Sequence, residues 1–296
     1  MRLPTAGGTP SEQVGDDAAG GGEALLREKE RAENFPVALR VLPRQVRTHL
    51  TAVYDVVRTV DDLGDEAAGD RTALLEEFRA DQATIWTGGT PRHPVLRRLA
   101  PTVRACGLAH EPFDRIVQAN LVDQRVTTYA SYEELRDYCR LSADPVGRIV
   151  LGIFGAETPE TVELSDRVCT ALQLVEHWQD VAEDRRRGRV YLPREDLDRF
   201  GVAEADLDLP AATGPVRRLV LFETDRAADL LESGAPLVRL LKGWARVAVA
   251  GYVAGGRGAV AALRRCGGDV LAAAPRTRRR DVVREVRKQL LTRGAR

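Results

Sequence analysis

The sequence has few of the residues that build zinc sites, secretory signals or membrane spans. Its 296 residues include four cysteines and four histidines, and neither C-x-x-C nor H-x-x-x-H spacing occurs, which excludes a typical zinc site. No apolar run approaches the roughly 18 residues of a membrane-spanning helix, and the N-terminus lacks the apolar core of a signal peptide. We therefore expect a soluble, cytoplasmic protein.

The chain also lacks an excess of either charge. With 44 basic and 44 acidic residues the formal net charge is zero, so no overall field favours nucleic acid as a partner. Hydrophobic residues make up 44% of the chain, enough for one large core. Residues 1–23 are rich in Gly, Ala, Pro and Asp and are expected to be a disordered tail. No Pro/Ser-rich linker divides residues 24–296, which we expect to form one domain.

Strand-like alternation of apolar and polar residues is missing, and apolar residues recur with a period near 3.6. The sequence therefore predicts an all-α protein. Expected helices span residues 23–33, 45–63, 70–86, 94–106, 111–124, 132–140, 161–187, 214–231, 236–265 and 281–291. Pro145 and the small residues around it are expected to interrupt the helical pattern at residues 141–147.

One charged stretch has a pattern typical of a binding or catalytic site rather than of core packing. Asp180 and Asp184 are four apart, and Glu176 lies one turn earlier, so the three carboxylates share one face of a helix. Their repulsion would be relieved by Mg²⁺, which takes oxygen ligands from carboxylates and substrate phosphates. Four guanidinium groups that suit phosphate oxygens follow at Arg185, Arg186, Arg187 and Arg189. The pattern indicates a metal and a diphosphate, with a solvated charged face as the alternative.

A second acidic row lies far upstream and favours the interpretation of the first row as part of a metal site. Asp61 and Asp65 are again four apart, and Arg58 and Tyr54 lie on the same helix face. Two acidic rows, each with arginine beside it, predict two walls of one metal-bridged cavity.

These motifs, in this order, resemble the squalene/phytoene synthase family over about residues 28–290. The matching residues are Tyr54, Arg58, Asp61 and Asp65; Asp180 and Asp184; Arg189 and Tyr191; and Tyr138, Cys139, Ala143, Val146, Gly147, Phe154 and Gly155. The resemblance implies the isoprenoid synthase fold, a single helical bundle around a central cavity, and a prenyl diphosphate as substrate.

Within this family the sequence is most similar to the hydroxysqualene synthase branch of hopanoid biosynthesis. The similar segments are residues 33–37 (ENFPV), 142–148 (SADPVGR) and 178–180 (WQD). That branch implies ionisation of presqualene diphosphate and capture of the cation by water to give hydroxysqualene. It also implies a small Mg²⁺ cluster as cofactor and no NADPH.

The resemblance implies a role for individual residues. The expected metal ligands are Asp61, Asp65, Glu176, Asp180 and Asp184, the expected diphosphate ligands are Arg58, Arg189 and Gln173, and the expected cavity residues are Phe35, Leu39 and Val146. The rings of Tyr54 and Tyr191 are expected to stabilise cationic centres. These two tyrosines and the four motif aspartates are the expected catalytic residues. Gln179 and His177 are both candidates to position the capturing water.

Two residues depart from the family pattern, which usually has Asn where this chain has Glu176 and rarely has His at the position of His177. Two further functions therefore stay open: head-to-head condensation of two prenyl diphosphates to presqualene diphosphate or phytoene, and a non-catalytic scaffold. Peripheral membrane contact through a lipid substrate or product also stays open, as does contact with other enzymes of the squalene pathway. No basic amphipathic helix stands out as an anchor.

Overall fold

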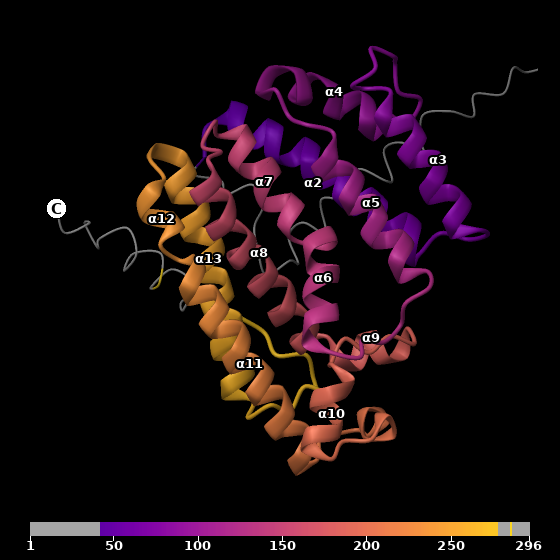
Figure 1. Ribbon diagram of the computed structural model, residues 1–296, viewed down its shortest axis with the longest axis vertical. Coiled ribbons are helices and arrows are strands. Elements are labelled where there is room, and N and C mark those ends of the chain that lie inside the picture. The colour runs from indigo at the N-terminus through magenta and orange to yellow at the C-terminus, as the bar shows by residue number, and fades with distance from the viewer. Residues whose placement is uncertain (1–41, 278–284, 286–296) are drawn as a thin grey trace, which may run out of the picture. The chain divides into compact units, whose positions relative to one another are not determined.

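The computed structural model describes residues 42–277 and residue 285 (Figure 1). All of them belong to one compact unit within residues 34–296. Several expectations lie outside the described residues: the tail at 1–23, the helices at 23–33 and 281–291, and the cavity residues Phe35 and Leu39.

The all-α expectation is confirmed, since the described residues form helices and one isolated β-bridge, between Thr128 and Val190. The α-helices are α2 (Arg44–Asp65), α3 (Arg71–Ala83), α4 (Pro94–Cys106), α5 (Glu111–Asp123), α6 (Tyr132–Ser142), α7 (Asp144–Ile153), α8 (Pro159–Gln179), α9 (Val181–Arg186), α10 (Arg194–Phe200), α11 (Gly214–Gly234), α12 (Leu237–Leu240) and α13 (Gly243–Arg265). A 3₁₀ helix, η1, spans Glu204–Asp208. No described helix is both long and apolar enough to cross a bilayer.

Local sequence explains most helix ends. The Ser131 hydroxyl accepts a hydrogen bond from the Glu134 amide, and the Glu134 carboxylate accepts one from the Ala130 amide at 2.7 Å, so side chains pair two backbone amides at the start of α6. Gly107 ends α4 with φ at +64°, as expected of a glycine in this position.

Two of the expected helices are divided in the structure. The helix expected at 161–187 is divided at Asp180 into α8 and α9, and the one at 236–265 is divided into α12 and α13. The expected interruption within 141–147 is confirmed, since α6 ends at Ser142 and α7 begins at Asp144. Pro145 lies in the first turn of α7, where its missing N–H leaves no helix carbonyl unpaired. The segment after Tyr191 contains α10 and η1, which periodicity did not predict.

Helix α8 is the centre of the fold. It packs against α7, α11 and α13, and its side chains Leu174, Val175 and Trp178 are fully buried in the largest apolar cluster. Helix α2 packs against α4 and α5 in a second cluster. The two helices expected to carry the acidic rows are therefore both fixed by buried apolar faces.

Candidate active site

The first acidic row lies on the last two turns of α2. Asp61 accepts a hydrogen bond from the Asn120 amide of α5 at 3.3 Å. Gly64 lies buried between these two residues and permits the close approach of α5, because a Cβ there would come within 2.4 Å of the Asn120 Oδ1. Asp61 is thereby held by the α2–α5 contact.

Arg58 precedes this row but its guanidinium is turned toward other carboxylates. Its Nε donates to Asp62 at 3.1 Å, and an Nη lies 3.5 Å from Glu66. Tyr54, one turn earlier, is buried with 6% of its surface exposed. The ion pair with Asp62 therefore holds the Arg58 guanidinium beside the first acidic row.

The second acidic row lies where α8 ends and α9 begins. Asp180 is the residue at the break, and its carbonyl accepts from the Asp184 amide at 2.8 Å, so both aspartates stay on adjacent turns. Burial, followed by repulsion from Asp184, raises the pKa of Asp180 to about 6. Glu176 is exposed, one turn before the two aspartates.

Two arginines join the rows. Arg189 donates to the Asp65 carboxylate at 2.8 Å, and Arg187 lies 3.6 Å from its other oxygen. The segment that carries them is fixed because the Val190 amide donates to the Thr127 carbonyl at 2.8 Å. The end of α2 and the turn after α9, more than a hundred residues apart, therefore meet at Asp65.

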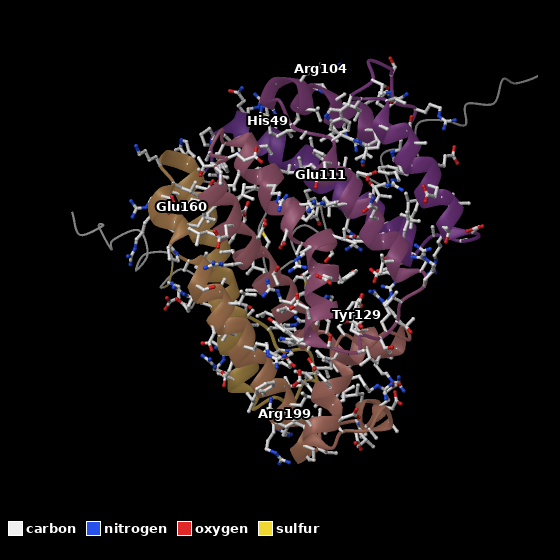
Figure 2. All side chains as sticks on the ribbon, in the orientation of Figure 1. His49, Arg104, Glu111, Tyr129, Glu160 and Arg199 are labelled. Atoms are coloured by element: carbon white, nitrogen blue, oxygen red, sulfur yellow. The ribbon has the colours of Figure 1, made fainter. Side chains whose placement is uncertain are left out.

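A buried aromatic cluster lies next to this contact. The Tyr191 ring stacks on His177 with centroids 3.7 Å apart, and Tyr138 lies 5.8 Å from Tyr191. Tyr129, between α6 and α9 in Figure 2, completes the cluster at 5.8 Å from Tyr191. The Tyr129 hydroxyl is buried and has no hydrogen-bond partner among the described residues.

Asp123, the last residue of α5, connects the tyrosines to the charged groups. Its carboxylate accepts a hydrogen bond from Tyr138 at 2.6 Å and one from Tyr191 at 3.3 Å. Burial raises the pKa of Asp123, although Tyr138 and Arg189 oppose the shift. Burial likewise raises the pKa of Tyr138 and Tyr191, so both phenols remain neutral donors.

The other predicted site residues lie in different surroundings. Gln173 reaches the cluster through His177, with their Nε2 atoms 3.3 Å apart. Val146 packs against the apolar cluster that includes α2. The Gln179 amide nitrogen donates to the Pro275 carbonyl at 2.5 Å. Arg185 is held by Asp208 and Glu204, whereas Arg187 and Arg189 contact Asp65 of the first acidic row.

Sequence reasoning missed Asp123, Asn120 and Tyr129 as members of this group. Asp123 and Asn120 stand alone on an apolar helix, with no second carboxylate at helical spacing to mark them. Tyr138 was matched to the family pattern without a role.

The donor set suits Mg²⁺ shared with a ligand. Among residues 42–277 no three His, Cys, Asp or Glu side chains converge as a ready-made ion site. Asp180 and Asp184 form a close pair whose repulsion an ion would relieve, and Mg²⁺ is usually bound by one or two carboxylates plus phosphate oxygens. The residues present therefore fit an ion that arrives with a diphosphate.

Comparison with known proteins decides the family. The squalene/phytoene synthase family matches residues 29–285. This protein belongs to the squalene/phytoene synthase family. Its chain is 33% identical over 213 residues to a hydroxysqualene synthase of Rhodopseudomonas palustris, covering 72% of each chain. It is also 33% identical over 210 residues to a phytoene synthase of Mycobacterium tuberculosis, covering 70% of this chain and 69% of the relative.

Solved structures agree with the fold. The squalene synthase HpnC of Alicyclobacillus acidocaldarius superposes with a TM-score of 0.75 at 43% identity, over 86% of this chain and 97% of the other. A dehydrosqualene synthase superposes with a TM-score of 0.81 at 23% identity, over 92% and 96%. The helical architecture is that of the isoprenoid synthases, and the family makes this protein an isoprenoid synthase enzyme.

Proposed function

We propose that this family member ionises presqualene diphosphate in a Mg²⁺-dependent reaction and captures the rearranged cation with water, giving hydroxysqualene and diphosphate. The likeness to HpnC and to hydroxysqualene synthases supports this branch. The observation that carries the proposal is the contact of Arg189, which follows the second acidic row, with Asp65 of the first row, beside buried tyrosines.

The diphosphate is held at the acidic rows. Asp61, Asp65, Asp180 and Asp184 are the proposed metal ligands, and the exposed Glu176 extends the second row. When bound, Mg²⁺ acts as a Lewis acid and neutralises charge that develops on the leaving diphosphate. Arg189 and Arg58 donate charge-assisted hydrogen bonds to the same oxygens, and Arg189 exchanges its contact with Asp65 for one with the ligand.

The tyrosine cluster faces the hydrocarbon part of the reaction. The C–O bond breaks with its electron pair leaving on diphosphate, and the cation is stabilised by the ring faces of Tyr191 and Tyr54, each worth roughly 0.5–2 kcal/mol. Tyr138 and Asp123 keep the Tyr191 ring in place through the shared carboxylate. Water then forms the new C–O bond, and its proton is lost to diphosphate or solvent.

Head-to-head condensation is the second candidate. It is supported by the 35% identity over 182 residues to a presqualene diphosphate synthase of Rhodopseudomonas palustris, and by the phytoene synthase relatives. The same acidic rows would serve it, since ionisation of a prenyl diphosphate begins both reactions.

Product analysis separates these functions. The protein with Mg²⁺ is given presqualene diphosphate in ¹⁸O-labelled water and, in parallel, farnesyl or geranylgeranyl diphosphate. We expect labelled hydroxysqualene from the first substrate and no product from the others. Consumption of farnesyl or geranylgeranyl diphosphate alone would favour condensation, and no turnover of any prenyl diphosphate would favour a scaffold. D61N and D180N, checked for native fold by circular dichroism, are expected to abolish turnover.

A further inference from the structure

The junction of α12 and α13 presents two large apolar side chains to solvent. Leu240 is 41% exposed and Trp244 is 45% exposed. Among the described residues two other large apolar side chains are exposed, Val126 at 36% and Leu209 at 42%. Trp244 differs from the other two tryptophans, since Trp178 is fully buried and Trp86 is half-buried.

The junction is firmly seated, so this exposure is not that of a loose loop. Leu237, Val238, Leu241 and Ala245 are all buried in the apolar cluster that α12 and α13 share with α8 and α11. Gly243 turns the chain with φ at +54°. Leu240 and Trp244 are the large apolar residues between these anchors that are exposed.

The charged residues within the junction segment itself are basic. Arg239 and Lys242 are exposed beside the two apolar side chains, and no Asp or Glu occurs along the chain between Gly234 and Gly268. Acidic residues lie on the neighbouring helices, with Glu160 on α8 (Figure 2) and Glu232 on α11, where Glu232 pairs with Arg257. The exposed Trp–Leu pair is therefore flanked by two exposed cations of its own segment.

We propose that this junction, defined as residues 239–244, docks the protein on the surface of an anionic phospholipid bilayer. Tryptophan favours the headgroup level of a bilayer, where its ring is half in hydrocarbon. Lysine and arginine near an anionic leaflet add attraction. The pair projects outward, which suits shallow insertion into a bilayer.

The docking surface is separate from the acidic rows. The cluster below the junction includes Val162 and Leu164 near the start of α8, whereas Gln179 and Asp180 lie at its far end. Because an α-helix rises 1.5 Å per residue, these ends are about 25 Å apart. The proposal rests on this surface alone and does not depend on which prenyl diphosphate reacts.

Vesicle binding tests it with full-length protein. We expect co-sedimentation with phosphatidylglycerol vesicles and much less with phosphatidylcholine vesicles. Tryptophan emission should shift to shorter wavelength on binding, and loss of the shift in the variant that lacks Trp244 assigns it to that residue rather than to the half-buried Trp86. L240S/W244S should lose both signals, and K242Q, which removes one positive charge, should weaken binding about fivefold.

Leu209→Ser is the matched control, because Leu209 is 42% exposed and lies outside the junction; it should bind vesicles as the parent does. L240S/W244S and L209S should both keep the parental turnover of prenyl diphosphate in detergent. Equal binding by L240S/W244S and the parent would overturn the proposal. A parental dimer that L240S/W244S converts to a monomer, without vesicle binding by either, would assign the surface to a second copy of this chain instead.

Discussion

At the scale of single residues, Asp123 determines how the tyrosine cluster is held. Its carboxylate accepts from both Tyr138 and Tyr191. We expect Tyr138→Phe to lower the free energy of unfolding by about 1–3 kcal/mol, because the phenol is lost from a largely desolvated carboxylate. Urea unfolding measures this.

Tyr129→Phe is the control from the same cluster. Its hydroxyl has no hydrogen-bond partner among the described residues, so its removal should change stability by no more than about 0.5 kcal/mol. A loss in Y129F as large as that in Y138F would show that general packing, rather than the bond to Asp123, holds the cluster.

Asp144 gives a prediction about pH. It is 5% exposed at the start of α7 and accepts a hydrogen bond from Thr170 at 2.8 Å. Burial, with Asp166 nearby, raises its pKa to about 7. Since the folded state holds the proton more tightly than the unfolded chain, the stability from this group is complete below about pH 4 and is lost as the pH rises through 7. The loss amounts to at most about 4 kcal/mol.

Asp144→Asn should therefore be more stable than the parent at pH 8 and lose that advantage toward pH 4, as measured by urea unfolding across this range. Asp114→Asn is the control of opposite sign, because a hydrogen bond from Arg79 lowers the pKa of Asp114; it should be less stable than the parent at pH 8 and at pH 5.5. A stability difference between D144N and the parent that does not change with pH would contradict the assignment.

At the scale of helices, α8 and α11 approach closely at Gly234. A Cβ there would lie 2.8 Å from the Leu164 carbonyl oxygen and 3.0 Å from the Val168 amide nitrogen. We expect Gly234→Ala to destabilise the fold by about 1–3 kcal/mol, because backbone cannot yield as a side-chain tip can. That cost exceeds the gain of up to about 1 kcal/mol from helix propensity.

Gly214→Ala tests the same substitution at the start of α11, where the nearest atom is Arg218 Nη1 at 3.5 Å. It should leave the thermal midpoint nearly unchanged, whereas G234A should lower it. Equal midpoints for the two variants would mean that α11 moves away from α8 at little cost.

The helix breaks mark what periodicity could and could not predict. Apolar spacing predicted α2, α4 and α5 closely, because one buried stripe fixes each helix. It did not predict the break at Asp180, because buried apolar residues, Trp178 and Val181, lie on both sides of it. The break before Lys242 has a local cause, since Gly243 turns the chain there with φ at +54°. Asp180 lies at a break and still keeps Asp184 one turn away through a backbone hydrogen bond.

At the scale of the whole molecule, the acidic rows were visible in the sequence because their members are four residues apart. Asp123 and Asn120 were not, since each joins the group only through contacts between α5 and distant segments. The Arg189–Asp65 contact likewise spans the chain. Spacing can therefore find the carboxylates of each wall, while the residues that connect the walls become apparent only in three dimensions.

Because the candidate site is assembled from segments more than a hundred residues apart in the chain, its ligands should stabilise the whole chain. Mg²⁺ with inorganic diphosphate, at about 100 times the dissociation constant, should add about 2.7 kcal/mol and raise the thermal midpoint by roughly 5–10 °C. Neither component alone should do so, since carboxylates repel free diphosphate and too few of them converge to hold the ion tightly.

D61N and D180N should each remove most of this shift, because one lies on α2 and the other at the end of α8. Glu232→Gln, which removes a surface ion pair with Arg257, should keep it in full. Differential scanning calorimetry measures all three. Loss of the shift in D180N but not in D61N would place the ligand on the α8–α9 row alone, and the two walls would then not act together.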